Sequence, residues 1–141
     1  MRTKEKIIKE SLKLFNENTF EVSTTSLISQ KSNILEGSLW YHFNSKFDIV
    51  SAHLDMFTDL YDEHKELTTK NNPNIFIEGL FAIYGIIWDY RYLFRDSFEK
   101  IIEKKPNLFD KIIDINSSID HWVKEFVIHA QNIGIIIIDE E

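Results

Sequence analysis

Helix-breaking residues are scarce in this sequence, and that scarcity restricts its fold more than any other feature. Only four glycines and two prolines occur among the 141 residues. Sandwiches and barrels need turn residues at short, regular intervals, so this scarcity argues against a turn-rich all-β fold. The sequence also contains no cysteine, which excludes disulfides, thiol catalysis and cysteine-based zinc sites. We therefore expect an all-α protein.

Apolar residues recur at helical spacing along nearly the whole chain. Thr3 is expected to cap the first helix and Asn18 to end it in a left-handed conformation, while Ser45 and Asp48 are expected to form a capping box for the fourth. The segment 75–88 is apolar enough to be a buried core helix. Four consecutive isoleucines at 135–138 would make a sticky edge unless they are covered. The expected helices cover about 3–18, 24–32, 36–42, 45–67, 75–88, 91–104 and 107–132.

Charge is distributed unevenly along the chain. Residues 1–50 carry a net charge of +1 and residues 51–141 a net charge of −8, which gives −7 overall. Because phosphate binding is largely electrostatic, this division allows a nucleic-acid role for the first third only. We predict two domains, 1–47 and 48–141. A helix over 48–67 connects them, and the polar stretch 68–73, which closes with Asn-Pro, follows as a linker.

A helix, a tight turn and a second short helix within residues 23–43 match a helix-turn-helix, whose second helix enters the major groove. Residues 37–46 read GSLWYHFNSK and residues 24–29 read TTSLIS. These stretches resemble the "G-[ST/N]-L-Y-x-H-F-x-[ST/N]-K" and "T-T-x-x-I-A" signatures of the tetracycline-repressor (TetR) family of bacterial transcriptional regulators. The resemblance covers residues 3–50. It implies an N-terminal three-helix DNA-binding head followed by a helical ligand-binding and dimerisation bundle.

The sequence departs from the family pattern at four positions. The turn glycine is Asn33, which can adopt a positive φ, the alanine is Ser29, and the usual tyrosine is Trp40. Glu36 stands where members often carry a neutral or basic residue. Its carboxylate would be repelled by phosphate or would accept a hydrogen bond from a cytosine amino group. Members also carry two further C-terminal helices that form the dimer bundle, so this sequence is either truncated or dimerises by other means.

The resemblance implies that the DNA contacts come from the second and third helices and the residues after them. Gly37 lets the backbone approach a base edge, and Ser38 can reach a base or a phosphate. Trp40 is expected to lie against a thymine methyl or a sugar, and Glu36 lies beside these groups. The residues expected to touch phosphates are Thr25, Tyr41, His42 and Lys46.

The acidic second part is rich in aromatic residues and is the expected sensor. Residues 90–96 read YRYLFRD and resemble the "W-R-Y-F-F-R-D" stretch in the ligand-binding half of one TetR subgroup. An aromatic interior with one acid suits a small apolar or cationic effector, through attraction to the ring faces. The predicted ligand-binding residues are Glu78, Phe81, Tyr84, Trp88, Tyr92 and Trp122.

Other chemistry is poorly supported by the sequence. His121 and His129 lie roughly 12 Å apart along one helix, too far to share a metal with Glu125. No glycine-rich phosphate loop and no nucleophile–base spacing occurs. We expect no enzymatic activity, no cofactor and no metal. The sequence contains no apolar run of 18 residues and no signal peptide, so we expect a cytoplasmic protein without a membrane partner.

Two functions remain open at this stage. The first is a ligand-responsive repressor that acts as a homodimer on a near-palindromic DNA operator, with half-sites about one helical turn apart. The second is a helical small-molecule-binding or protein-interaction module with a degenerate DNA-binding head. Glu36 and the weak positive charge of the head favour the second.

Overall fold

The computed structural model describes residues 1–137 and 139, and this part of the chain is helical and without strands. The all-α fold expected from the sequence is therefore confirmed. The elements are α1 (Thr3–Glu17), α2 (Thr25–Lys31), α3 (Glu36–His42), α4 (Lys46–Lys65), the 3₁₀ helix η1 (Glu66–Thr69), α5 (Pro73–Asp89), α6 (Tyr92–Arg95), α7 (Glu99–Lys104) and α8 (Pro106–Asn132).

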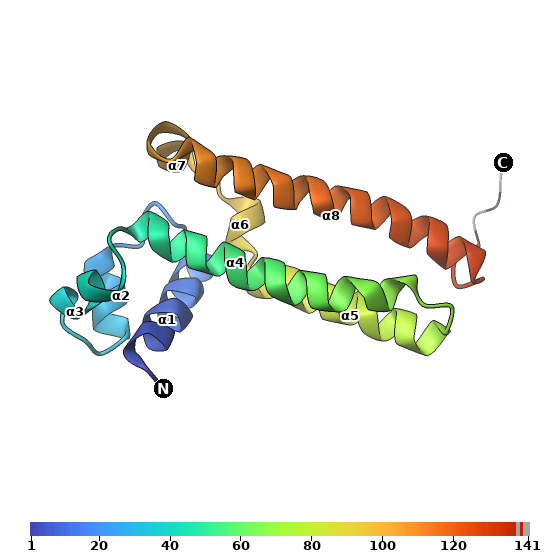
Figure 1. Cartoon of the computed structure of the whole chain (residues 1–141), viewed down its shortest axis with the longest axis horizontal. Helices are drawn as coiled ribbons and strands as arrows, with labels where there is room; N and C mark the ends of the chain where they lie inside the picture. Colours follow the sequence, from blue (N-terminus) through green and yellow to red (C-terminus); the bar gives the residue numbers. More distant parts are fainter. Residues whose placement is uncertain (138, 140–141) are drawn as a thin grey trace.

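The helices α1, α2 and α3 lie together at one end of the molecule, and the long helices α4, α5 and α8 extend away from it (Figure 1). We call α1, α2 and α3 the head, and α4 to α8 the body. α4 leaves the head and forms a hairpin with α5, through η1. α6 then crosses between α5 and α7, and α8 runs along the other side of α4 (Figure 1).

Several short-range features of the sequence set the helix boundaries in the structure. The Thr24 hydroxyl accepts a hydrogen bond from the Leu27 N–H at 3.1 Å and caps α2. Asn33 takes a φ of 54° in the turn after α2, which its short polar side chain tolerates better than most residues do. Pro73 occupies the first turn of α5, and the Asn72 side chain caps that helix.

Two expected caps differ from the structure. Arg2, not Thr3, is the N-cap of α1, and Asn18 ends that helix with a φ of −112° rather than in the left-handed region. Ser45 makes no side-chain cap bond. The carboxylate of Asp48 instead accepts a hydrogen bond from the Asn44 N–H at 3.1 Å. Asp48 thus bonds to the backbone of Asn44, one residue before the serine expected to be its partner in the capping box.

The expected single helix over 91–104 is wrong, because it breaks at Phe98 into α6 and α7. Phe98 has a φ of 56°, in the left-handed region, which is costly for a bulky residue. Its buried ring contacts the rings of Phe20 and Tyr92, with centroids 6.0 and 6.1 Å away. Aromatic packing against the head therefore decides the backbone conformation at this position.

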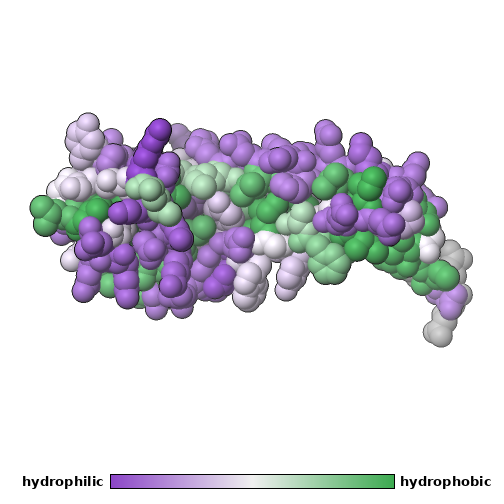
Figure 2. Space-filling model, turned by 90° about the horizontal axis from the view of Figure 1, so that it is seen from below, coloured by the Kyte–Doolittle hydropathy of each residue, from purple (hydrophilic) through white to green (hydrophobic). Residues whose placement is uncertain are grey.

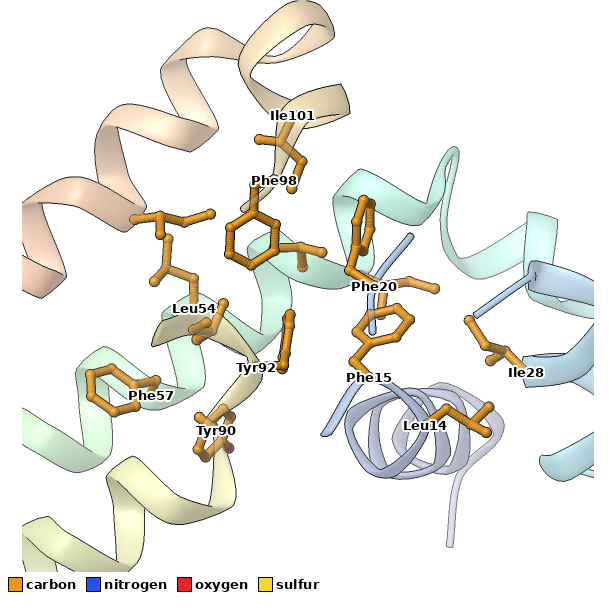
Figure 3. Close-up of a cluster of buried hydrophobic side chains, with 14 of the residues drawn as sticks. Leu14, Phe15, Phe20, Ile28, Leu54, Phe57, Tyr90, Tyr92, Phe98 and Ile101 are labelled. Carbon is orange, nitrogen blue, oxygen red and sulfur yellow. The ribbon is translucent and has the colours of Figure 1, made fainter. Parts of the chain in front are cut away.

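One continuous apolar core joins the head to the body (Figure 3). Phe15 of α1 packs edge-on against Tyr92 of α6, with ring centroids 5.1 Å apart. Phe57 of α4 packs against Tyr90 at the end of α5 in the same way. Because buried rings from both parts contact one another, the head and the body fold as one packed unit in the described residues.

The predictions of a linker over 68–73 and of a buried core helix over 75–88 both differ from the structure. Within 68–73, Thr68 belongs to η1 and is buried, so the loop is limited to residues 70–72. The helix over 75–88 buries Phe76 and Ile83 but exposes other large apolar side chains. It is therefore an amphipathic helix with one uncovered face, not a fully buried one.

The end of the described chain is partly exposed. Gly134 takes a φ of 78° after α8, and Ile137 is exposed. Ile138, one of the four consecutive isoleucines, lies outside the described residues. Among the described helices, none is both long and apolar enough to cross a membrane.

Candidate nucleic-acid interface

α2, the turn after it and α3 form a helix-turn-helix that rests on α1. The turn is closed by the Ile34 N–H, which donates to the Ser29 carbonyl at 3.1 Å. The Ser29 hydroxyl donates to the Thr25 carbonyl. The serine that stands in place of the family's alanine therefore has a hydrogen-bond partner for its hydroxyl. α2 contacts both α1 and α3. The three helices therefore have the arrangement that presents a second helix to the major groove.

α3 buries one side and presents the other to solvent. Leu39 is fully buried and Phe43, just after the helix, is buried as well. Trp40 is 43% exposed and Tyr41 is 85% exposed. A Cβ built at Gly37 would meet nothing within 4 Å, so the backbone there is open. Ser38 and His42 are half-buried.

A hydrogen bond joins the starts of α2 and α3 on this exposed side. The Thr25 hydroxyl donates to the Glu36 carboxylate at 3.0 Å. This bond positions Glu36 in the first turn of α3, where a carboxylate is favoured by the helix dipole. It also brings a negative charge to the face that would approach DNA, which weakens phosphate binding.

Replacing Glu36 with glutamine is expected to raise the affinity for DNA severalfold at low salt, and less at high salt. The amide oxygen can still accept from Thr25, so the local structure is kept. Fluorescence anisotropy with a labelled duplex from the region upstream of its own gene, at two salt concentrations, measures the change. Glu103→Gln on α7 is the control. Equal affinities for wild type and Glu36→Gln at low salt would contradict the placement of Glu36 against DNA.

Lys46, expected to touch phosphate, has partners inside the protein. Its ammonium donates to the carbonyls of Phe20 and Ser23, the second at 3.0 Å, and lies 4.1 Å from the centroid of the Phe20 ring. Burial lowers the pKa of Lys46 below its ordinary value, and the Glu21 carboxylate partly opposes this shift. Lys46 therefore fastens the start of α4 to the segment between α1 and α2.

One residue of this face was missed by the sequence argument. Leu35, the N-cap of α3, is 81% exposed beside the open backbone of Gly37. An exposed leucine at the start of a reading helix can contact a thymine methyl. The sequence held no clear signal for this exposure, because Leu35 is spaced four and eight residues before the buried Leu39 and Phe43 and so reads as part of the same apolar side.

The head is fastened to the body by a cluster of hydrogen bonds at the end of α1. The Asn16 amide donates to the Asp89 carbonyl at 2.6 Å and its oxygen accepts from the Tyr92 N–H at 3.1 Å. The Arg95 guanidinium donates to carbonyls in the last turn of α1, and Asp96 accepts from the Phe20 N–H at 2.8 Å. We call this cluster the α1–α6 clamp.

The predicted ligand-binding residues do not come together. Glu78, Phe81, Tyr84 and Trp88 lie exposed on α5, so the expectation that these rings line an interior is wrong. Tyr92 is fully buried, and its hydroxyl lies 2.8 Å from Nδ1 of His53. Among these residues, Trp122 lines a groove in the body.

That groove has a volume of about 910 Å³ and lies between the C-terminal half of α4, η1 and α8. The Trp122 indole N–H donates to the Thr68 hydroxyl at 3.0 Å, and its ring lies 5.5 Å from that of Phe126. The aromatic and acidic residues of its wall are Tyr61, Glu66, Asp114, Trp122, Glu125 and Phe126, with Lys65 as the one lysine.

A helix-turn-helix head with an exposed second helix, carried on a helical body, defines the class of helix-turn-helix transcriptional regulators. Comparison with known proteins agrees with this class. No family model matches the chain. The chain is 27% identical over 128 residues to the biofilm operon icaADBC HTH-type negative transcriptional regulator IcaR of Staphylococcus aureus (strain Newman). That match covers 87% of this chain and 68% of the relative.

Two further comparisons extend the likeness. The regulator of the same name from Staphylococcus epidermidis (strain ATCC 35984) is 28% identical over 125 residues, which are 86% of this chain and 62% of the relative. The crystal structure of a TetR-family transcriptional regulator from Marinobacter aquaeolei VT8 matches with a TM-score of 0.78 and 25% identity, over 100% of this chain and 70% of that chain. The chain thus resembles TetR-family regulators in sequence and in fold, and these relatives are regulators rather than enzymes.

Proposed function

We propose that this protein is a transcriptional repressor that binds a near-palindromic DNA operator through α2 and α3. The observation that carries the proposal is the outward side of α3. Open backbone at Gly37 and two exposed rings, Trp40 and Tyr41, stand on a helix whose opposite side is fixed in the core. Exposed groups on a rigid helix at this place in the fold suit readout of base edges and grip on phosphates.

The groove between α4 and α8 supports a sensor role for the body. Its aromatic wall and its carboxylates Glu66, Asp114 and Glu125 suit a small apolar or cationic effector. α4 borders the groove and reaches the head, and the α1–α6 clamp joins the head to the body on a second route. An effector that binds two arrangements of these helices unequally would shift the population between them and change DNA affinity.

Gel mobility shift with DNA from the region upstream of its own gene tests the DNA-binding proposal. We expect a shifted band that weakens as salt rises, because phosphate contacts release counterions. Competition by unrelated DNA at equal concentration should be at least tenfold weaker. No shift from a folded sample would overturn the proposal. That result would favour the alternative, a small-molecule-binding or protein-interaction module with a degenerate DNA-binding head. The negative charge of Glu36 and the internal partners of Lys46 are the observations that favour this alternative.

Replacing Tyr41 with alanine is expected to lower the affinity for operator DNA about tenfold or more, since a hydrogen bond to a charged group such as phosphate is worth roughly 1.5–3 kcal/mol. Its ring is 85% exposed, so the melting temperature should stay within about 1–2 °C of wild type. Ile113→Ala, on the exposed side of α8, is the control and should bind DNA like wild type. A Tyr41 variant that binds normally would remove Tyr41 from the interface.

A further inference from the structure

Glu36 places a carboxylate at the start of α3, the part of a helix-turn-helix that contacts base edges in the major groove. It is the first residue of the helix and is exposed, and the preceding Leu35 is 81% exposed. Figure 2 shows hydrophobic and near-neutral surface next to hydrophilic side chains at the end of the molecule where Figure 1 places α3. Mixed surface of this kind suits base edges, which offer both polar groups and thymine methyls.

Thr25 holds one oxygen of this carboxylate and leaves the other open. The Thr25 hydroxyl donates to Oε1 of Glu36 at 3.0 Å. Within residues 1–137 and 139, Oε2 has no hydrogen-bond partner and Glu36 enters no ion pair. Thr25 and Glu36 are the first residues of α2 and α3, so two helix starts fix the carboxylate together. The second oxygen is therefore oriented before any DNA binds, which lowers the entropy cost of a contact.

The chemistry of a carboxylate selects among the base edges. An ionised carboxylate can only accept hydrogen bonds. In the major groove the donors are the N4 amino group of cytosine and the N6 amino group of adenine, whereas guanine and thymine present acceptors. The adenine amino group lies beside the N7 acceptor, which repels a carboxylate, so cytosine is the best match. Opposite guanine or thymine, the carboxylate would lose water and gain no donor in return.

We propose that Glu36 is a specificity-determining residue, whose carboxylate accepts a hydrogen bond from the N4 amino group of a cytosine in each operator half-site. Thr25 is the residue that positions it. This inference rests on the proposed function, because it requires that α3 enters the major groove. It goes further by naming the base pair that is read, and it gives the carboxylate a role on a face where its charge weakens phosphate binding.

The weak positive charge of the head agrees with a role in discrimination. Residues 1–50 carry a net charge of only +1, so the sequence-independent attraction to phosphates is small. Glu36 lowers this attraction on every sequence, and a correctly placed cytosine recovers part of the loss. The ratio of specific to non-specific affinity therefore rises, and this ratio decides occupancy among the competing sites of a genome. Glu36 acts mainly against wrong sequences, which is one of the two routes to specificity.

Selection of binding sites from a randomised duplex library identifies the position that Glu36 reads. We expect the wild type to enrich C·G at one position of each half-site. Glu36→Gln should enrich the same site except at that position, where A·T replaces C·G or no base pair dominates, because an amide also donates and pairs well with adenine. Glu103→Gln on α7 removes one exposed charge far along the chain and should select the same site as the wild type.

Fluorescence anisotropy with four duplexes that differ only at this position measures the size of the effect. The wild type should bind the C·G duplex roughly fivefold or more tightly than the T·A duplex. Glu36→Gln should bind these two within about twofold, because its amide accepts from cytosine and donates to O4 of thymine. The same change still raises the affinity overall, since the amide keeps an acceptor and loses the charge.

The selection separates a failure of this inference from a failure of the proposed function. Identical base preferences at every position in the wild type and in Glu36→Gln would overturn the role of Glu36 and leave the DNA-binding proposal standing. That result would mean that Glu36 serves only the bond to Thr25. A folded wild type that enriches no sequence would overturn both.

Thr25→Val tests the positioning role. Valine keeps the shape of the side chain and removes the hydroxyl that holds Glu36. The ratio of affinities for the C·G and T·A duplexes should fall severalfold, whereas loss of a phosphate contact alone would lower the affinity for all four duplexes equally. Thr25→Ser keeps the hydroxyl and should recover the wild-type ratio. An unchanged ratio in Thr25→Val would show that Thr25 does not position Glu36.

Discussion

Replacing Asn16 with alanine is expected to lower the free energy of unfolding by about 3 kcal/mol. The Asn16 side chain is nearly buried, at 7% exposed. It donates to the Asp89 carbonyl and accepts from the Tyr92 N–H, both on the segment that joins α5 to α6. Alanine would leave two backbone groups without their partner in a region closed to water, and each orphaned group costs roughly 1–3 kcal/mol.

Urea denaturation monitored by circular dichroism measures this loss as a lower midpoint. Asn18→Ala is the matched control: its side chain is exposed two residues further along, and the change should stay within about 0.5 kcal/mol of wild type. If both variants unfold at the same urea concentration, the α1–α6 clamp does not stabilise the fold. Arg95→Gln gives an independent check, because it removes three bonds to carbonyls of Phe15, Asn16 and Asn18.

The α1–α6 clamp also helps to hold the head and the body together around one shared apolar core. Its donors come from α1 and α6, about 75 residues apart in sequence, and the aromatic contacts of Phe15 and Tyr92 lie directly beside it. A displacement of α6 therefore moves the end of α1. A displacement of α6 would thereby reach α2 and α3, which both contact α1.

Local signals predicted the head well. The bounds of α3 are those expected from the motif, and Asn33 takes the positive φ expected of it in the turn. Such features depend on a few neighbouring residues and need no knowledge of the rest of the fold. The exposure of Tyr41 and the burial of Leu39 follow from helical spacing once α3 is placed.

The features that the sequence did not predict depend on distant contacts. The break at Phe98 comes from packing on Phe20, some 80 residues earlier. The internal bonds of Lys46 require the fold of the segment before α2. The exposed rings of Phe81, Tyr84 and Trp88 on α5 were predicted to lie in the interior, because apolar content alone cannot tell a covered side of a helix from an uncovered one.

The environment of His53 also depends on contacts with distant residues, and it leads to a prediction about the pH dependence of stability. His53 is fully buried in α4, where Nε2 lies 2.9 Å from the Ile8 carbonyl and Nδ1 lies 2.8 Å from the Tyr92 hydroxyl. In the neutral ring with Nε2–H as donor, Nδ1 accepts from Tyr92, so both nitrogens are satisfied; this tautomer is assigned from the bonding pattern. Burial lowers the pKa of His53 to about 4, although the bond to Ile8 partly opposes the shift.

Stability is therefore expected to fall as the pH decreases from about 6.5 to about 4. Within this interval the unfolded chain binds a proton at His53, with an ordinary pKa near 6.5, and the folded chain does not. The contribution of the neutral ring is complete above pH 6.5 and is lost toward pH 4. The full loss is about 3 kcal/mol, because each pKa unit corresponds to about 1.4 kcal/mol.

His53→Gln isolates this contribution from the carboxylates that titrate in the same range. The glutamine amide can donate to Ile8 and accept from Tyr92, and it carries no proton equilibrium. The difference in free energy of unfolding between wild type and His53→Gln should shift against the wild type by about 3 kcal/mol from pH 7 to pH 4. His121→Gln, an exposed histidine on α8, is the matched control. Urea midpoints for wild type and His53→Gln that change in parallel with pH would mean that His53 is protonated as readily in the folded chain as in the unfolded one.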